Sequence, residues 1–156
     1  MHRILASVFV VATLTACAGG DVAHTTPPEG YLQDAPARVA AVDWSTAETV
    51  EVVLSEYDFA PAAPSFEAGR PYHLVLRNAG SWTHTFTSRG FFQAIAVQKL
   101  ASASGEQDRP YIEKIEIPAG GTKELTFVAV RAGNYPLECS VFLHDAFGMT
   151  GDITIR

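Results

Sequence analysis

The sequence predicts an all-β protein: a two-layered β-sandwich with Greek-key connections and one short helix or lid inserted between strands. Apolar and polar residues alternate through four short segments, which is the spacing of strands that bury one face. Turn signals rich in glycine separate these segments. Short alternating strands between such turns are typical of β-sandwiches. The chain has 156 residues, enough for one domain with an N-terminal extension.

The alternating segments cover residues 50–55, 72–77, 115–117 and 125–129, and the turn signals lie at residues 68–69, 79–80, 118–121 and 132–134. Another strand is expected to end at Cys139. Tyr135, Leu137 and Cys139 share one face of it, which we expect to point into the core. The hydroxyl of Tyr135 is expected to bond nearby backbone, as a corner tyrosine does.

Two segments do not follow the strand pattern clearly. Residues 91–105, FFQAIAVQKLASASG, break the alternation, and we expect a short helix or a lid that packs on the sandwich. Residues 37–44, ARVAAVDW, carry a weak alternation, from which we expect an edge strand.

The N-terminus has the features of an export signal. A basic start precedes an apolar run over residues 4–14, which is too short to span a bilayer as a helix. The run ends in Leu-Thr-Ala-Cys at residues 14–17, which resembles a bacterial lipobox and predicts a lipid on Cys17. The alternative is an ordinary signal peptide cleaved near residues 16–18, with an incidental cysteine.

The chain is therefore expected to divide into a lipoprotein signal peptide at 1–16, a flexible tether at 17–36 and a folded domain at 37–156. The tether is rich in glycine, proline and polar residues. Such a protein would be held at the cell envelope, periplasmic or on the outer surface, by its N-terminal lipid alone.

Charge limits the partners of the mature chain. Removing residues 1–16 removes one basic residue, Arg3, of 11 and none of the 17 acidic residues, so the formal net charge changes from −6 to −7. Nucleic acid and anionic membrane surfaces are therefore excluded as electrostatic partners, and a basic redox protein is allowed. We expect a monomer without a disulfide, since each cysteine has another use.

The segment CSVFLHDAFGM places Cys139, His144 and Met149 five residues apart, after a predicted strand. With the upstream His84 they make up two imidazoles, a thiolate and a thioether, the ligand types of an electron-transfer copper site. Singly, each has an ordinary alternative as a core or surface residue. The conjunction favours a metal site, because Cys139 is the only cysteine after the lipobox Cys17 and Met149 the only methionine after Met1.

The pattern C-x4-H-x4-M, with a histidine after the turn NAG, resembles the cupredoxins, the blue copper proteins of the plastocyanin and azurin type. The segments YDFAPAAPSFEAGRPYHLVLRNAG and GNYPLEC are also similar to that family, and the resemblance covers residues 48–156. It implies one copper ion per chain, with His84, Cys139 and His144 as strong equatorial ligands and Met149 as the axial ligand.

The resemblance implies a one-electron carrier in which electrons pass through His144. The alternative is copper delivery or sequestration at the cell envelope. We do not expect an enzyme, since no nucleophile or proton-transfer pair accompanies the ligands and four protein ligands leave no open position. Trp82, Phe142 and Phe147 either form an apolar docking rim or fill the core beneath the loops.

Overall fold

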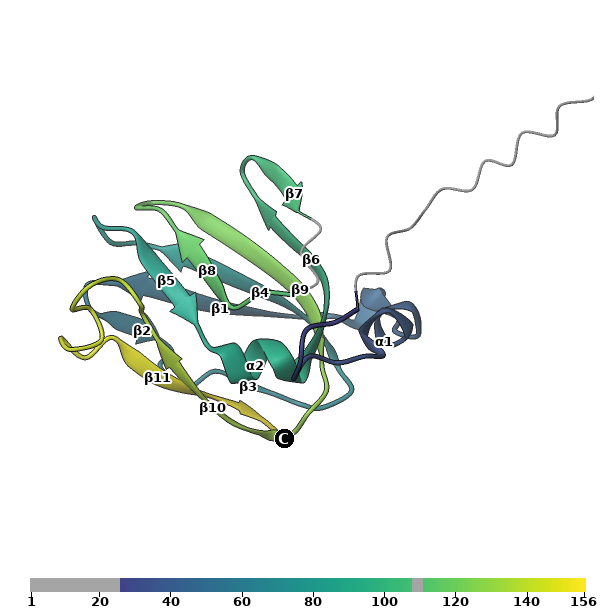
Figure 1. Cartoon of the computed structure of the whole chain (residues 1–156). Coiled ribbons are helices and arrows are strands. Elements are labelled where there is room, and N and C mark those ends of the chain that lie inside the picture. The colour runs from purple at the N-terminus through teal and green to yellow at the C-terminus, as the bar shows by residue number, and fades with distance from the viewer. Residues whose placement is uncertain (1–25, 108–110) are drawn as a thin grey trace, which may run out of the picture.

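The computed structural model describes residues 26–107 and 111–156, so the predicted signal peptide, Cys17 and the rest of the tether up to residue 25 lie outside the described residues. Two β-sheets face one another, and α2 (Arg89–Ala94) lies between them at one end (Figure 1). The first sheet has the order β2-β1-β4-β9-β6-β7 and the second the order β3-β11-β10-β5-β8. The expected all-β sandwich is confirmed.

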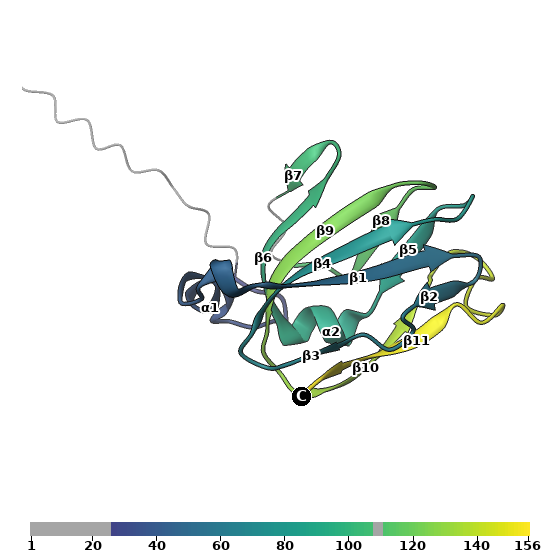
Figure 2. The ribbon, with the colours of Figure 1, turned by 180° about the vertical axis from the view of Figure 1, so that it is seen from behind.

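The strands of the first sheet are β1 (Glu48–Ser55), β2 (Asp58–Ala60), β4 (Pro71–Asn78), β6 (Ile95–Ser102), β7 (Gly105–Gln107) and β9 (Thr122–Ala129). Those of the second are β3 (Ser65–Phe66), β5 (His84–Thr87), β8 (Lys114–Ile117), β10 (Gly133–Glu138) and β11 (Thr150–Ile155). The chain crosses between the sheets several times, for example from β4 to β5 and from β9 to β10. Two pairs, β1 with β4 and β3 with β11, are parallel, and the view from behind shows β1 along β4 (Figure 2).

The core between the sheets is rich in aromatic side chains. The ring of Phe66 contacts those of Tyr72, Phe91 and Phe127, with centroids 4.9, 5.6 and 5.2 Å away, respectively. None of the four residues is more than 2% exposed. Burial of such a side chain stabilises the fold by about 1.5–3 kcal/mol. This cluster joins β3, β4, β9 and α2, so it fixes the two sheets against each other.

The expected interruption at residues 91–105 is partly confirmed. A short helix, α2, buries Phe91 and Phe92. The residues after it are not a lid, because they form β6, which pairs with β9. A β-bulge between Val97 and Lys99 shifts the register of this pair. The bulge breaks the alternation of apolar residues, and for that reason the sequence pattern did not reveal the strand.

The expected edge strand at 37–44 is wrong. The chain forms α1 (Ala35–Ala40), which has a proline in its first turn, and then a 3-10 turn, η1 (Trp44–Thr46). Proline suits the first turn of a helix because its fixed φ is helical and its missing N–H has no partner there.

The folded domain begins earlier than the expected boundary at residue 36, because two residues of the expected tether pack against it. Tyr31 and Leu32 are each 5% exposed, and the Tyr31 hydroxyl donates to the carbonyl of Ile112 at 2.7 Å. Leu32 belongs to a small apolar cluster with Ala96 and Val128 on the outside of the first sheet. Two apolar residues in a polar segment give no periodic signal, so only their packing shows that the folded part includes them.

The strand that leads to Cys139 is confirmed as β10. Leu137 is buried and Glu138 is exposed, while the Tyr135 hydroxyl donates to the carbonyl of Arg131 at 2.7 Å, as expected of a corner tyrosine. In the antiparallel pair of β10 with β5, Glu138 lies opposite Thr87. This register carries the chain after β10 toward the start of β5. The two segments thus meet at one end of the sandwich.

Candidate metal centre

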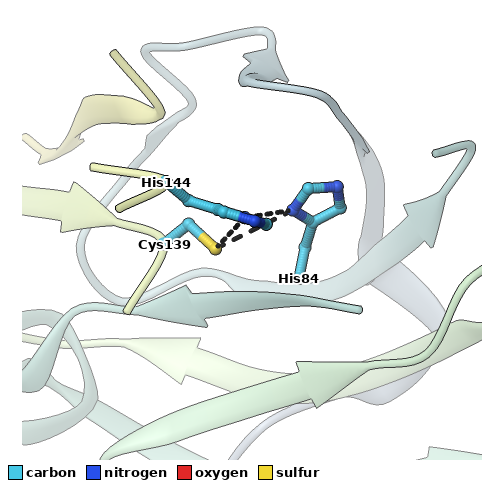
Figure 3. A group of neighbouring side chains, drawn as sticks. All are labelled: His84, Cys139 and His144. Carbon is cyan, nitrogen blue, oxygen red and sulfur yellow. Dashed lines mark hydrogen bonds between the residues drawn. The ribbon is translucent and has the colours of Figure 1, made fainter. Parts of the chain in front are cut away.

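Three of the four predicted ligands come together at that end of the sandwich. His84 is the first residue of β5, Cys139 follows β10 directly, and His144 lies on the loop between β10 and β11. Cys139 Sγ lies 3.8 Å from His84 Nδ1 and 3.5 Å from His144 Nδ1, and the two nitrogens are 3.1 Å apart. All three residues are buried, and their donor atoms point at one another (Figure 3).

The spacing of these donors fits a single metal ion. With bonds of about 2.0 Å to nitrogen and about 2.3 Å to sulfur, a planar trigonal site separates its donors by about 3.5 to 3.8 Å. The three measured separations lie within about half an ångström of those values. Two imidazoles with one thiolate form the ligand set of trigonal electron-transfer copper. Convergence of buried donor atoms is therefore the property that a type 1 copper site requires.

The ligand loop, defined as residues 139–149, closes through its own backbone. The N–H of Cys139 donates to the carbonyl of Met149 at 3.1 Å, and the N–H of Met149 donates to the carbonyl of His144 at 3.0 Å. Gly148 has a φ of +99°, which favours glycine. These bonds bring the two ends of the loop together, so His144 is folded back over Cys139.

Met149 is fully buried next to the backbone of Cys139. This position is consistent with the fourth ligand, a weak thioether. Its role as the axial ligand stays a prediction.

Met149→Leu is expected to keep the thiolate charge-transfer band of the copper-loaded protein and to raise the reduction potential. The axial bond is long and weak, so its loss leaves the equatorial ligands intact while removing a donor that favours Cu(II). Voltammetry and the visible spectrum measure the two effects. Loss of copper binding would show that Met149 is a principal ligand, and an unchanged potential would remove Met149 from the site.

Thr85, which the sequence pattern did not single out, directs two hydrogen-bond donors at the sulfur of Cys139. Its N–H lies 3.4 Å and its hydroxyl 3.7 Å from Cys139 Sγ. The Thr85 hydroxyl also accepts from the N–H of Ser140 at 2.7 Å. The one feature of the sequence that could have indicated this role is that Thr85 directly follows the predicted ligand His84.

Burial and the neighbouring His144 lower the pKa of His84, with a smaller opposing effect from Glu56. A lower pKa keeps the imidazole neutral at physiological pH and leaves a lone pair free for a metal. The Nε2 atom of His84 is 3.5 Å from Glu56 Oε1. Hydrogen bonds from the backbone, that of Trp82 foremost, lower the pKa of the Glu56 carboxyl.

Large apolar side chains gather around the ligands on the outside. Within the described part of the chain, the large hydrophobic residues that are exposed all lie on the ligand loop, on the loop before His84, or on the turn after β1. These residues, the apolar rim, are Tyr57 (38% exposed), Trp82 (65%), Phe142 (86%), Leu143 (46%) and Phe147 (63%). Of the two alternatives left open by the sequence, filling of the core is excluded for Trp82, Phe142 and Phe147, because all three are exposed. Their part in docking stays a prediction.

Tyr57 partly covers the third ligand. Its ring centroid lies 4.9 Å from that of His144 and 5.0 Å from that of Phe147. His144 is only 6% exposed. The ring of Tyr57 therefore contributes to the burial of the imidazole.

Comparison with solved structures shows which known fold the chain adopts. Auracyanin B is 20% identical, with a TM-score of 0.50 over 74% of this chain and 93% of that chain. The chain has the cupredoxin fold. The multicopper oxidase of Campylobacter jejuni superposes on this chain with a TM-score of 0.55 at 13% identity, over 74% of this chain and 31% of that chain.

In sequence, the chain is similar to laccase-6 of Arabidopsis thaliana, with 28% identity over 120 residues. The match takes in 60% of this chain and 21% of the laccase, so the chain spans about a fifth of that protein. No protein-family model matches the chain. Within the described residues, no helix is both long and apolar enough to cross a bilayer.

Proposed function

We propose that this cupredoxin domain carries single electrons between redox partners, with one copper ion held by His84, Cys139, His144 and Met149. The observation that supports this most strongly is the buried convergence of the two imidazoles and the thiol at one point. Bound copper would supply a one-electron Cu(I)/Cu(II) couple. The protein's part is to fix the donors beforehand, so that neither oxidation state demands a large rearrangement.

An electron carrier fits the donor set better than an oxidase does. With Met149 as the fourth ligand, the site has no position left for a substrate. The similarity covers 21% of the laccase and 31% of the multicopper oxidase of Campylobacter jejuni. Their activity therefore does not transfer to this chain. The fold and the site account for electron transfer without any further chemistry.

The apolar rim supports docking at the copper end. Large exposed apolar patches on a protein domain mark interaction sites, and here Tyr57 of the rim packs against His144, the ligand that lies nearest to solvent. Electrons would pass through the imidazole of His144, beneath Tyr57 and Phe147. A partner seated on the rim would exclude water from this path and shorten it.

The proposal also includes export and anchoring at the cell envelope through a lipid on Cys17. Its support is the sequence of residues 1–17, which lie outside the described residues. Fractionation of cells that express the full chain, with and without Cys17→Ser, tests it: a variant that stays in the membrane fraction would rule out this anchor.

Copper retention separates an electron carrier from a copper donor. We expect the Cu(I) protein to keep its metal when it is mixed with a copper-free acceptor of comparable affinity, because the donors are buried and fixed. The same protein should exchange electrons rapidly between its reduced and oxidised forms. Fast copper transfer together with slow self-exchange would favour the delivery function instead.

A further inference from the structure

The first observation is an unsatisfied ring nitrogen on a ligand. His84 directs Nδ1 at the other two donors. With Nδ1 as the metal-binding atom, the proton of the neutral imidazole resides on Nε2. This nitrogen is buried and makes no hydrogen bond of ordinary geometry with any described residue. A buried N–H of this kind needs an acceptor.

The nearest charged acceptor is Glu56, on the turn between β1 and β2. Its Oε1 atom lies 3.5 Å from His84 Nε2, and its side chain is 29% exposed. At this separation the pair is at the outer limit of a hydrogen bond, and a small side-chain rotation would close it. Glutamate is ionised at neutral pH, so the group facing the ring carries a negative charge.

The carboxylate is held in place by the loop that leads to His84. Glu56 Oε1 accepts the N–H of Ser81 at 2.6 Å and the N–H of Trp82 at 2.9 Å. The same loop is fixed by Asn78, whose Nδ2 donates to the carbonyls of Trp82 and Ile117 at 2.8 and 2.9 Å. The carboxylate is thus anchored to the loop that carries the ligand histidine.

Gly80 makes room for this carboxylate. A Cβ atom at residue 80 would lie 2.5 Å from Glu56 Oε1 and 2.7 Å from Oε2. Such distances are far below van der Waals contact, so any larger residue would displace the carboxylate. The N–H of Gly80 is itself bound by Asn78 Oδ1 at 2.9 Å. The loop is therefore shaped around Glu56.

We propose that Glu56 is a positioning residue for the metal centre: it accepts the Nε2–H of His84, fixes the ring, and by its charge favours Cu(II) over Cu(I). A carboxylate behind a ligand histidine orients the ring and makes it a stronger donor. A negative charge near the metal also stabilises the more positive oxidation state. This inference rests on the proposed function, since it concerns the potential of the copper couple.

The matched variants are Glu56→Gln and Asp58→Asn. Each removes one negative charge from the hairpin of β1 and β2, but Asp58, the first residue of β2, is exposed and has no described contact with a ligand. Glu56→Gln should lower the ratio of Cu(II) to Cu(I) affinity about tenfold, which raises the one-electron potential by about 59 mV. Asp58→Asn should change it several-fold less. Equal shifts in the two variants would overturn the proposal.

Gly80→Ala tests the same contact without altering the carboxylate. Its Cβ should push Glu56 away from His84, so its potential should rise as that of Glu56→Gln does. Loss of fold is checked by the near-ultraviolet circular dichroism of each variant. A folded Gly80→Ala protein with the potential of the wild type would count against the proposal.

A measurement on the copper-free protein separates this proposal from the copper assignment. Nitrogen-15 spectra of the histidine rings report which nitrogen carries the proton. The wild type should hold the His84 proton on Nε2 and protect it from solvent exchange, and Glu56→Leu should lose that protection. Unchanged protection would refute the Glu56 contact, whereas a wild type without a copper band would refute the proposed function alone.

Discussion

Replacing Cys139 with serine is expected to abolish the intense visible band of the copper-loaded protein completely. The band arises from charge transfer out of a thiolate, and a hydroxyl has no comparable donor orbital. Cys139 Sγ lies within 3.8 Å of the Nδ1 atoms of His84 and His144. It is the only sulfur donor among these three residues. Copper affinity should fall as well, because the strongest donor is lost.

The fold should survive this change, since serine is close to cysteine in volume. The hydroxyl can accept the N–H of Thr85, which now points at the sulfur from 3.4 Å. The visible spectrum after copper addition and the thermal unfolding of the copper-free protein measure the two effects. A band that persists in the folded serine variant would refute the ligand assignment.

Charged substitution of Phe142 is expected to slow electron self-exchange about tenfold to hundredfold while leaving the reduction potential unchanged. Phe142 is 86% exposed, so its replacement removes no core packing. A charge within an apolar contact must be desolvated when two rims meet. The contacts that dominate an interface contribute about 2 kcal/mol or more, which corresponds to about 30-fold.

The control is Ala132→Asp, an exposed residue in the turn before β10, at the end of that strand opposite to Cys139. It adds the same charge as Phe142→Asp but far from the rim. Phe142→Lys completes the set, because desolvation penalises either sign. Line broadening in mixtures of reduced and oxidised protein gives the rates. Equal rates for Phe142→Asp and Ala132→Asp would show that electrons do not pass through the rim.

The sequence by itself determined the strands that alternate cleanly and the chemical identity of the site. Alternation with a period of two sets which face of a strand is buried, so the pattern alone assigns Leu137 and Cys139 to the core side. The spacing of Cys139, His144 and Met149 is equally local, because a short loop after a strand confines its residues to one place. The predicted copper ligands followed from this local pattern and from the cupredoxin resemblance.

Only the tertiary structure decided which distant residues share that place. The contact of Thr85 with the thiolate depends on the register between β5 and β10, and the approach of Glu56 to His84 depends on two loops that meet at the sheet end. Neither leaves a periodic or compositional trace. The same holds for Tyr31, which lies in a polar segment yet packs against Ile112. Alternation reports burial along one strand, whereas these contacts arise between segments that only the packed sheets bring together.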